Sequence, residues 1–570
     1  MTVVSRVLGR LGHLGAPETT DVVVDRDLAM VAPDGVTLLA DRWYPRDHPT
    51  GRPTVLLRSP YGRRQFGPFA RLLAERGYQV VVQSCRGSFG SGGEWVPFRN
   101  EAADGRATYA WLAEQPWFGA VAAGFGPSYL GLTQWAVATD PPAGLAAIAP
   151  MVTARRFRDV VVYPGGSFTL ETGATWLYLL QHQELGLAQV IRAQIRARRL
   201  LGPAFTTLPL SKAEQAVLGR EVAFYQDWLL HDQVGDPWWD PMDFTTDTSR
   251  VPPATFVGGW YDIFLPAQVD DFVALRDAGR TARLTIGPWT HSSPRAALAG
   301  IADGIEWFDQ HLRRRPAKRT AAVRLWIMGR DKWVDLDAWP PPAVLQRWYL
   351  HPQGRLSPEA VDAVDAVDGP DRFRYDPADP TPGVGGPSLN AANSGPRDQE
   401  KREQRLDVLT YTSDPLERPM TVAGPLNAEI WVRPSVEFVD VHVRLCTVDD
   451  RGRSHNLSDG ILRLHPQHPI PAAPETAVAI THGGAPGWGE VERTADGTLR
   501  VRVRMWPTAV TWKKGQRIRV QVAAGAHPLF ARNLGSGEPL GSGTRLVAVN
   551  QEIYRDAEHP SAIELPVSPI

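Results

Sequence analysis

The sequence predicts an α/β domain that is interrupted by a helical insertion and followed by an all-β domain. Buried strands alternate with helices in residues 1–152 and again in 250–320. Long helical windows fill 153–249, and short alternating runs separated by turn clusters fill 321–570. A chain of 570 residues is also too long for a single hydrophobic core. We therefore expect the chain to divide into these four segments, and the first and third to form one domain.

The composition excludes several classes of protein. Hydrophobic residues make up 43% of the chain and charged residues 22%, which is typical of a globular enzyme. A net charge of -1 argues against a nucleic-acid or membrane-surface partner. No run approaches the length of a transmembrane helix, and the N-terminus has no convincing cleavage site, so we expect a cytoplasmic protein. Cys85 and Cys446 are too few for a disulfide framework or a metal cluster, and we expect neither a metal nor a cofactor.

Alternating strands and helices in the α/β segments imply parallel β-α-β units. A hairpin is expected at the start, on either side of the turn Pro33-Asp34-Gly35. The expected strands are 22–24, 36–40, 55–57, 78–83, 121–123 and 146–150, and 254–262 and 283–291 are each expected to be a strand that ends in a loop. The expected helices are 69–76, 101–115, 129–138, 267–278 and 301–312.

In the insertion, helices are expected at 189–201 and 210–230. The first carries Arg192, Arg196, Arg198 and Arg199, which we interpret as a solvated helix face because flanking charges balance them. In the all-β part, strands are expected at 323–328, 347–350, 427–432, 441–447, 499–505 and 516–522, as in a β-sandwich or jelly roll. The segment 380–396 is expected to be a long surface loop, and 465–474 a second loop.

Ser128 lies between the strand expected at 121–123 and the helix expected at 129–138, with small residues around it. This pattern is typical of a nucleophile elbow, in which a sharp turn exposes a serine above the sheet and small neighbours let strand and helix pack closely. The match to G-x-S-x-G is imperfect, because Leu130 takes the usual place of the second glycine, which follows at Gly131. An ordinary Gly-Ser turn therefore remains an alternative on these residues alone.

The order of other polar residues supports acyl transfer. A serine nucleophile needs a histidine base and an acid that orients it, and in α/β-hydrolases the chain order is serine, acid, histidine. Asp262 and His291 follow the two resumed strands in that order. The N–H of Tyr129 could stabilise an oxyanion, with the hydroxyl of Tyr61 as a weaker second candidate. The alternatives are a turn aspartate, a loop histidine and a packing tyrosine.

Longer motifs resemble the cocaine esterase and X-Pro dipeptidyl-peptidase family of serine hydrolases. In the α/β segments these are RSPYG (58–62), CRGSFGSGGEW (85–95), GFGPSYLGLTQW (124–135), GGWYDIF (258–264) and GPWTHS (287–292). The later part adds DVLTYTSDPL (407–416), GPLNAEIWV (424–432) and HPLFARN (527–533). The resemblance implies an α/β-hydrolase domain, an inserted helical cap and a C-terminal jelly roll of the galactose-binding type.

By this resemblance Ser128 is the nucleophile, His291 the base and Asp262 its partner, while Tyr61 and the Tyr129 amide form the oxyanion hole. The displaced glycine also agrees with the family's G-x-S-Y-x-G. We expect a carboxylesterase whose apolar acyl pocket includes Trp176 and Phe264, acting on a small-molecule ester or a short peptide. An X-Pro dipeptidyl peptidase, an α-amino-acid ester hydrolase and a non-catalytic ligand-binding protein are the alternatives. The sequence leaves the substrate and the oligomeric state open.

Overall fold

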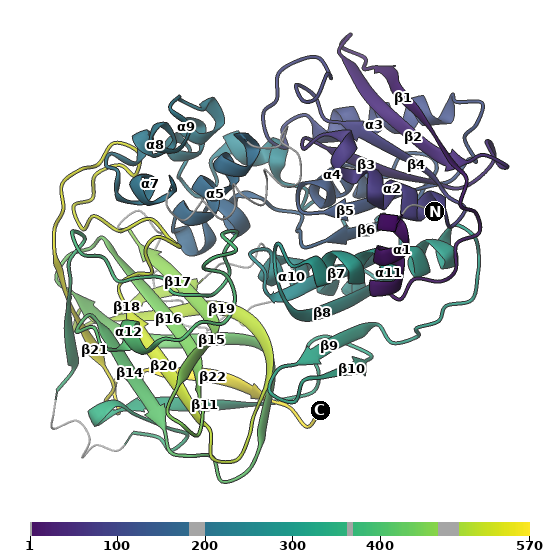
Figure 1. Cartoon of the computed structure of the whole chain (residues 1–570). Helices are drawn as coiled ribbons and strands as arrows, with labels where there is room; N and C mark the ends of the chain where they lie inside the picture. The colour runs from purple at the N-terminus through teal and green to yellow at the C-terminus, as the bar shows by residue number, and fades with distance from the viewer. Residues whose placement is uncertain (1–2, 182–199, 362–368, 466–488) are drawn as a thin grey trace. The chain divides into compact units, whose positions relative to one another are not determined.

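The computed structural model describes residues 3–181, 200–361, 369–465 and 489–570 (Figure 1). The chain forms two compact units. The main segments of the first are Met1–Phe157 and Gly235–Arg324, and those of the second are Arg158–Leu179 and Leu325–Ile570, with residues of 200–234. In the described part of the chain, no helix is long and apolar enough to cross a membrane.

The first unit is built on a mainly parallel sheet, as expected. Its strands are β1 (Val22–Val31), β2 (Thr37–Pro45), β3 (Thr54–Ser59), β4 (Gln79–Ser84), β5 (Ala122–Pro127), β6 (Leu145–Met151), β7 (Ala254–Tyr261) and β8 (Ala282–Thr290). They lie in the order β1-β2-β4-β3-β5-β6-β7-β8. The β1–β2 hairpin is antiparallel and joins β4 antiparallel, whereas all later neighbours run parallel. The carboxyl ends of β5, β7 and β8 consequently share one edge of the sheet.

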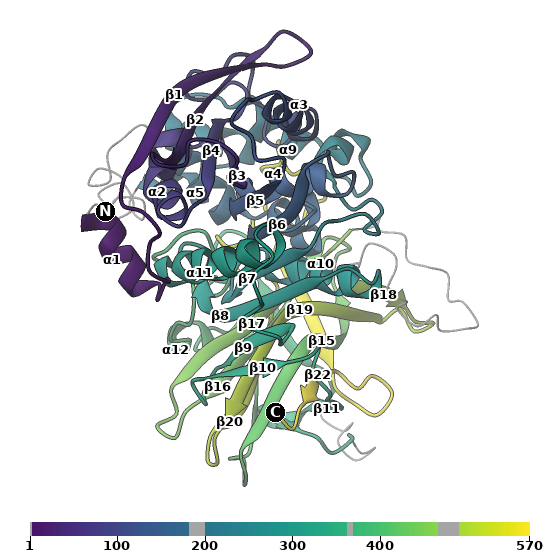
Figure 2. The same cartoon turned by 90° about the vertical axis from the view of Figure 1, so that its right-hand side faces the viewer.

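Helices cover both faces of this sheet (Figure 2). They are α1 (Val3–Leu11), α2 (Gly67–Ala74), α3 (Glu101–Ala113), α4 (Tyr129–Ala138), α10 (Leu265–Asp277) and α11 (Pro294–His311), with short turns η1 (Arg63–Phe66) and η5 (Pro237–Met242). Gly124 of β5 faces α4, because an added Cβ would lie 2.7 Å from Cγ of Gln134. The next residue, Phe125, packs on Phe308 of α11 with ring centroids 6.0 Å apart. Successive strand residues point to opposite faces, so α4 and α11 sandwich β5.

One helix boundary in this unit was predicted wrongly. Helix α11 begins at Pro294, seven residues before the expected start at 301. Proline suits the first turn of a helix because its φ is preset and its missing N–H has no partner there. The first two turns carry a single large apolar side chain, Leu298, among alanines and a glycine, so the hydrophobic period that guided the prediction begins only at Ile301.

The helical part of the second unit consists of short pieces. They are η2 (Arg158–Val162), η3 (Pro164–Gly166), α5 (Leu170–Gln181), α7 (Gly202–Thr206), η4 (Leu210–Lys212), α8 (Ala213–Leu218) and α9 (Ala223–Leu230). The single helix expected at 210–230 is wrong, because Gly219 adopts φ +68° and ends α8. The helix expected at 189–201, with its four arginines, lies outside the described residues up to 199.

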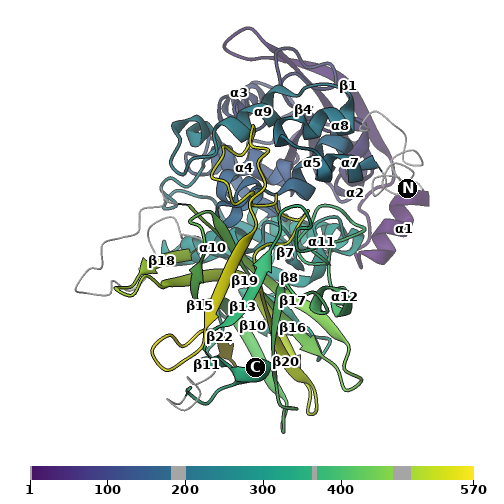
Figure 3. The ribbon, with the colours of Figure 1, turned by 90° about the vertical axis from the view of Figure 1, so that its left-hand side faces the viewer.

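The rest of the second unit is rich in strands (Figure 3). They are β11 (Val344–His351), β12 (Arg355–Ser357), β13 (Asp371–Tyr375), β14 (Val408–Ser413), β15 (Met420–Pro434), β16 (Val439–Val448), β17 (Ser454–Leu464), β18 (Gly489–Arg493), β19 (Leu499–Trp512), β20 (Arg517–Ala523), β21 (Val549–Tyr554) and β22 (Ala562–Val567). The hairpin strands β9 (Val323–Ile327) and β10 (Lys332–Leu336) precede them, and α12 (Glu400–Glu403) precedes β14. The sheet order is β13-β21-β15-β22-β11-β12-β14-β20-β16-β17-β19-β18, and β15 also pairs with β19. That additional pairing closes the sheet into a barrel-like shape.

The segment 380–396 contains no strand or helix, but its expected position on the surface is wrong. Ser388 is 1% exposed and Asn390 7%. Both donate to the carboxylate of Glu171 in α5, as does Asn393, at 2.6, 2.9 and 3.0 Å. The polar composition that suggested a surface loop instead satisfies a buried carboxylate. Of the second expected loop, 465–474, only His465 is described.

Candidate active site

Ser128 forms the turn between β5 and α4 with a strained backbone. Its φ is 55° and its ψ is -121°, a region that L-residues other than glycine rarely occupy. Its N–H donates to the carbonyl of Met151 at 2.9 Å, and its carbonyl accepts from the N–H of Gly131 at 2.8 Å. These bonds hold the turn in a conformation that costs about 1–3 kcal/mol. The local geometry is that of a nucleophile elbow.

Two glycines permit this elbow. Gly126 has φ +139°, and an added Cβ would lie 2.6 Å from Cβ of Leu130. At Gly131 an added Cβ would lie 2.2 Å from Cγ2 of Thr153, just after β6. Helix α4 can therefore approach the sheet only if residue 131 has no side chain. The displaced second glycine of the motif has a steric reason.

His291 connects the other two predicted residues. Its Nε2 lies 3.1 Å from Oγ of Ser128, and its Nδ1 lies 2.8 Å from Oδ2 of Asp262. Asp262 is fully buried, and its Oδ1 accepts the N–H of Phe264 at 2.8 Å. A carboxylate can only accept, so Nδ1 carries the proton and Nε2 presents its lone pair to the serine hydroxyl. This arrangement can remove a proton from Ser128.

The two predicted tyrosines lie beside each other. Tyr129 opens α4 directly after Ser128, and Tyr61 follows the carboxyl end of β3. Their rings make an edge-to-face contact with centroids 6.0 Å apart. Tyr129 is 1% exposed, and burial, followed by the charge of Glu101, raises the pKa of its phenol well above 10.0. Its side chain is therefore a protonated, buried group, and its backbone N–H adjoins the serine.

The predicted pocket residues fall in different units. The Phe264 ring lies 5.6 Å from the His291 ring, centroid to centroid, in the first unit. Trp176 belongs to the second unit, where it stacks on Trp228 with an interplanar angle of 2° and a centroid distance of 5.7 Å. Its role in an acyl pocket stays a prediction.

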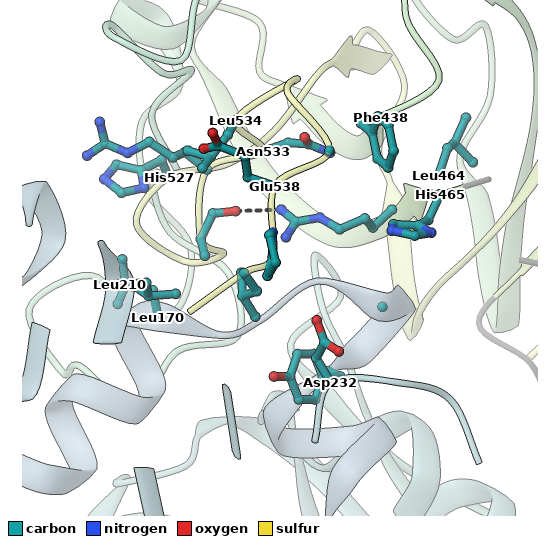
Figure 4. A pocket seen from close by; sticks show the side chains of 18 of the residues that line it. Leu170, Leu210, Asp232, Phe438, Leu464, His465, His527, Asn533, Leu534 and Glu538 are labelled. Atoms are coloured by element: carbon teal, nitrogen blue, oxygen red, sulfur yellow. Dashed lines mark hydrogen bonds between the residues drawn. The ribbon is translucent and has the colours of Figure 1, made fainter. Parts of the chain in front are cut away.

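A separate cavity of about 770 Å³ lies entirely in the second unit (Figure 4). Side chains of Leu170, Asp232, Phe438 and Glu538 are among its lining. None of the predicted site residues lines it. Within the described ranges, no group of three or more His, Cys, Asp or Glu is placed to hold a metal ion.

Sequence reasoning missed Glu101, which binds the side chain of Tyr129. Glu101 is 3% exposed, and its Oε1 accepts the hydroxyl of Tyr129 at 2.7 Å. In the sequence it is an acid in the first turn of a helix, a common position with no functional signal. Trp95, the last residue of the motif CRGSFGSGGEW (85–95), donates its indole N–H to the same hydroxyl at 3.1 Å.

A parallel sheet flanked by helices, with a strained serine hydrogen-bonded to a histidine that is paired with an aspartate, is the arrangement of α/β-hydrolases that use serine. The comparisons with known proteins identify the family. Residues 34–293 match the model of the S15 family, described as X-Pro dipeptidyl-peptidase. Residues 316–564 match the model of the X-Pro dipeptidyl-peptidase C-terminal non-catalytic domain.

A relative at 32% identity is the cocaine esterase of Rhodococcus sp. (strain MB1 Bresler), covering 94% of this chain and 96% of that protein. The chain therefore belongs to the cocaine esterase and X-Pro dipeptidyl-peptidase family, and it is a serine hydrolase. The second unit contains the strand-rich, non-catalytic domain of that family.

Two solved structures share the fold over nearly the whole chain. An α-amino acid ester hydrolase superposes with a TM-score of 0.79 at 22% identity, covering 97% of this chain and 98% of the other. An aminopeptidase from a marine sediment Thaumarchaeota archaeon gives 0.77 at 22% identity, covering 96% of each chain. At these identities the likeness establishes the fold alone.

Proposed function

We propose that this serine hydrolase is a carboxylesterase that uses Ser128, His291 and Asp262 as its catalytic triad. The observation that carries the proposal is the position of His291, which lies 3.1 Å from the serine oxygen and 2.8 Å from a fully buried carboxylate. A serine hydroxyl is a weak nucleophile unless a neighbouring base accepts its proton. The histidine meets that requirement, and Asp262 fixes its tautomer.

The reaction begins when Nε2 of His291 takes the proton of Ser128 as Oγ bonds to the ester carbonyl carbon. The resulting oxyanion accepts hydrogen bonds from the N–H of Tyr129 and the hydroxyl of Tyr61. When the tetrahedral intermediate collapses, the carbon–oxygen bond to the alcohol breaks, and the alkoxide takes the proton from His291. Water repeats the two steps on the acyl-enzyme and releases the carboxylic acid.

The substrate we propose is a small ester with an aromatic or other apolar acyl group. Phe264 supports this because its ring packs beside His291, and an apolar wall there suits an apolar acyl chain. We also propose that residues 153–249 act as a helical cap; Trp176 remains a candidate pocket residue from the sequence alone. For the strand-rich domain, 321–570, we propose a jelly roll of the galactose-binding type; the closure of its sheet by the β15–β19 pairing supports a double-layered architecture.

A second candidate is hydrolysis of peptides after an Xaa-Pro pair, or of α-amino-acid esters. The description of the matching family model favours the peptidase activity. Both activities require an acidic group that captures a free amine, and no residue of this chain is assigned that role. The carboxylesterase therefore remains our first proposal.

The test is hydrolysis of a panel of p-nitrophenyl esters, a benzoyl ester and Xaa-Pro anilides by the wild type and by Ser128→Ala. We expect ester turnover by the wild type, with benzoyl and other apolar acyl groups preferred, and none above background by the variant. Selective cleavage of the Xaa-Pro anilides would establish the peptidase instead. Equal rates in the two proteins would exclude Ser128 as the nucleophile.

A further inference from the structure

We propose that Glu101 is a positioning residue that holds both oxyanion donors in place by anchoring the side chain of Tyr129. The inference rests on the proposed function, in which the N–H of Tyr129 and the hydroxyl of Tyr61 face the developing negative charge. It adds a residue that contacts neither the serine nor the substrate. Three features of the buried interior carry it: the bonds of the Tyr129 hydroxyl, the ion pair of Glu101, and the contact between the two tyrosine rings.

The hydroxyl of Tyr129 makes a complete set of hydrogen bonds. It donates to Oε1 of Glu101 at 2.7 Å. It accepts from the indole N–H of Trp95 at 3.1 Å and from the backbone N–H of Phe98 at 3.0 Å. One donated and two accepted bonds exhaust the capacity of a phenol. Among the three partners only Glu101 is an acceptor, so it alone decides which way the hydroxyl points.

The other oxygen of Glu101 fixes the segment that leads to Tyr61. Oε2 pairs with a guanidinium nitrogen of Arg58 at 2.8 Å, and both side chains are at most 4% exposed. Arg58 also donates to the backbone carbonyl of Glu101 at 3.0 Å and, through Nε, to Gln83 at 2.9 Å. Because Arg58 lies in β3, three residues before Tyr61, Glu101 joins the end of β3 to the start of α4 through two buried charge-assisted bonds.

The Tyr129 ring transmits this anchorage to both donors. Its edge-to-face contact with Tyr61 has a centroid distance of 6.0 Å, and on another side it stacks on Phe98 at 4.1 Å. The same residue supplies the backbone N–H that follows Ser128. If the Tyr129 ring loses its bond to Glu101, we therefore expect the backbone N–H of Tyr129 and the hydroxyl of Tyr61 to shift together. A displacement of about 1 Å near a reacting group can cost a factor of about 100 in rate.

The test compares two changes that weaken the anchor with a matched control. Tyr129→Phe removes the bonded hydroxyl but keeps the ring and the backbone N–H. Glu101→Asp keeps the charge beside Arg58 but withdraws the carboxylate from Tyr129 by one methylene, and it carries the test if Tyr129→Phe does not fold. The control is Tyr78→Phe, because Tyr78 is 0% exposed and donates to Oδ1 of Asp309 at 2.7 Å in the same unit.

For each folded variant we would measure kcat and KM on a p-nitrophenyl ester and the affinity for a boronic acid, which forms a tetrahedral anionic adduct with a serine. We expect kcat to fall about 10- to 100-fold in Tyr129→Phe and Glu101→Asp, with KM within about threefold and boronate affinity reduced in parallel. In Tyr78→Phe both quantities stay within about twofold of the wild type. Loss of stability alone would lower the melting temperature without this split.

The positioning role is refuted if the anchor variants match Tyr78→Phe in kcat and boronate affinity while Ser128→Ala is inactive, because the serine esterase then stands without it. If Ser128→Ala keeps the wild-type rate, the proposed function itself fails, and the oxyanion hole fails with it. A parallel fall in kcat and boronate affinity confined to the anchor variants supports Glu101.

Discussion

Replacing Asp262 by asparagine tests the proposed triad most directly, because the structure leaves the new amide no good orientation. One oxygen of Asp262 faces Nδ1 of His291 at 2.8 Å, and the other faces the N–H of Phe264 at 2.8 Å. If the asparagine oxygen faces Phe264, its NH2 points at Nδ1 and forces the proton onto Nε2. If the amide turns over, its NH2 meets the N–H of Phe264, donor against donor.

The first orientation is the less costly, since leaving a buried backbone N–H without a partner costs about 1–3 kcal/mol. In that orientation Nε2 carries a proton and cannot accept the one from Ser128, 3.1 Å away. The corresponding change in another serine hydrolase lowers kcat about 10⁴-fold, which is about 5 kcal/mol of transition-state stabilisation. We expect a loss of the same order here, with KM little changed because the binding surface is intact.

The assay is the pre-steady-state burst of p-nitrophenol together with steady-state kcat. We expect acylation to become rate-limiting, so the burst disappears while the circular dichroism spectrum is unchanged. Asp440→Asn is the matched control, since Asp440 is 1% exposed and accepts two bonds of 2.8 Å from Arg463 in the other unit. A loss of less than about tenfold in Asp262→Asn, or an equal loss in Asp440→Asn, would refute this account of the histidine tautomer.

Two further predictions concern strain and pH. Ser128 has φ 55° and ψ -121°, a conformation that glycine tolerates better than alanine. We therefore expect Ser128→Gly to be about 1–2 kcal/mol more stable than Ser128→Ala in urea denaturation of the first unit. Equal stabilities would show that the turn stores no strain. Burial lowers the pKa of His442 in the second unit from 6.5 to about 4. The unfolded chain takes up this proton first, so the stability contributed by the neutral imidazole is present above pH 6.5 and about 3 kcal/mol is lost as the pH falls to 4. His442→Asn should flatten the dependence of the melting temperature of that unit on pH between these values, and an unchanged dependence would refute the assignment to His442.

Local sequence patterns were sufficient to predict most strands and helices of the first unit, and also that Ser128, Asp262 and His291 lie close together. A short apolar run, a turn of small residues and a helical pattern are decided within about ten residues of Ser128, and β5 and α4 form there. Asp262 and His291 follow buried strands, and in a parallel sheet such strand ends lie at one edge. This rule explains why His291 lies within hydrogen-bond distance of Asp262, 29 positions before it, and of Ser128, 163 positions before it. Their catalytic roles stay predictions that the hydrolysis assays test.

The errors arose where composition and period carry little information. Helix α11 begins earlier than expected because its first two turns hold only one large apolar residue, too few to show a hydrophobic period. A glycine with positive φ divides the helix expected at 210–230. The segment 380–396 was expected on the surface, yet Ser388, Asn390 and Asn393 bind Glu171 inside the second unit. The type of a polar residue does not reveal whether its hydrogen-bond partner is water or a buried carboxylate.

The sequence by itself determined the family, the mainly parallel sheet and the serine turn, because these depend on neighbouring residues and on motifs with fixed spacing. Only the tertiary structure showed why residue 131 must be glycine and which acid anchors Tyr129. Thr153, 22 positions after Gly131, leaves no room for a side chain there, and Glu101, 28 positions before Tyr129, binds its hydroxyl. Such contacts are set by how the sheet and its helices pack, and the hydrophobic period along the chain carries no record of which partner a buried side chain meets.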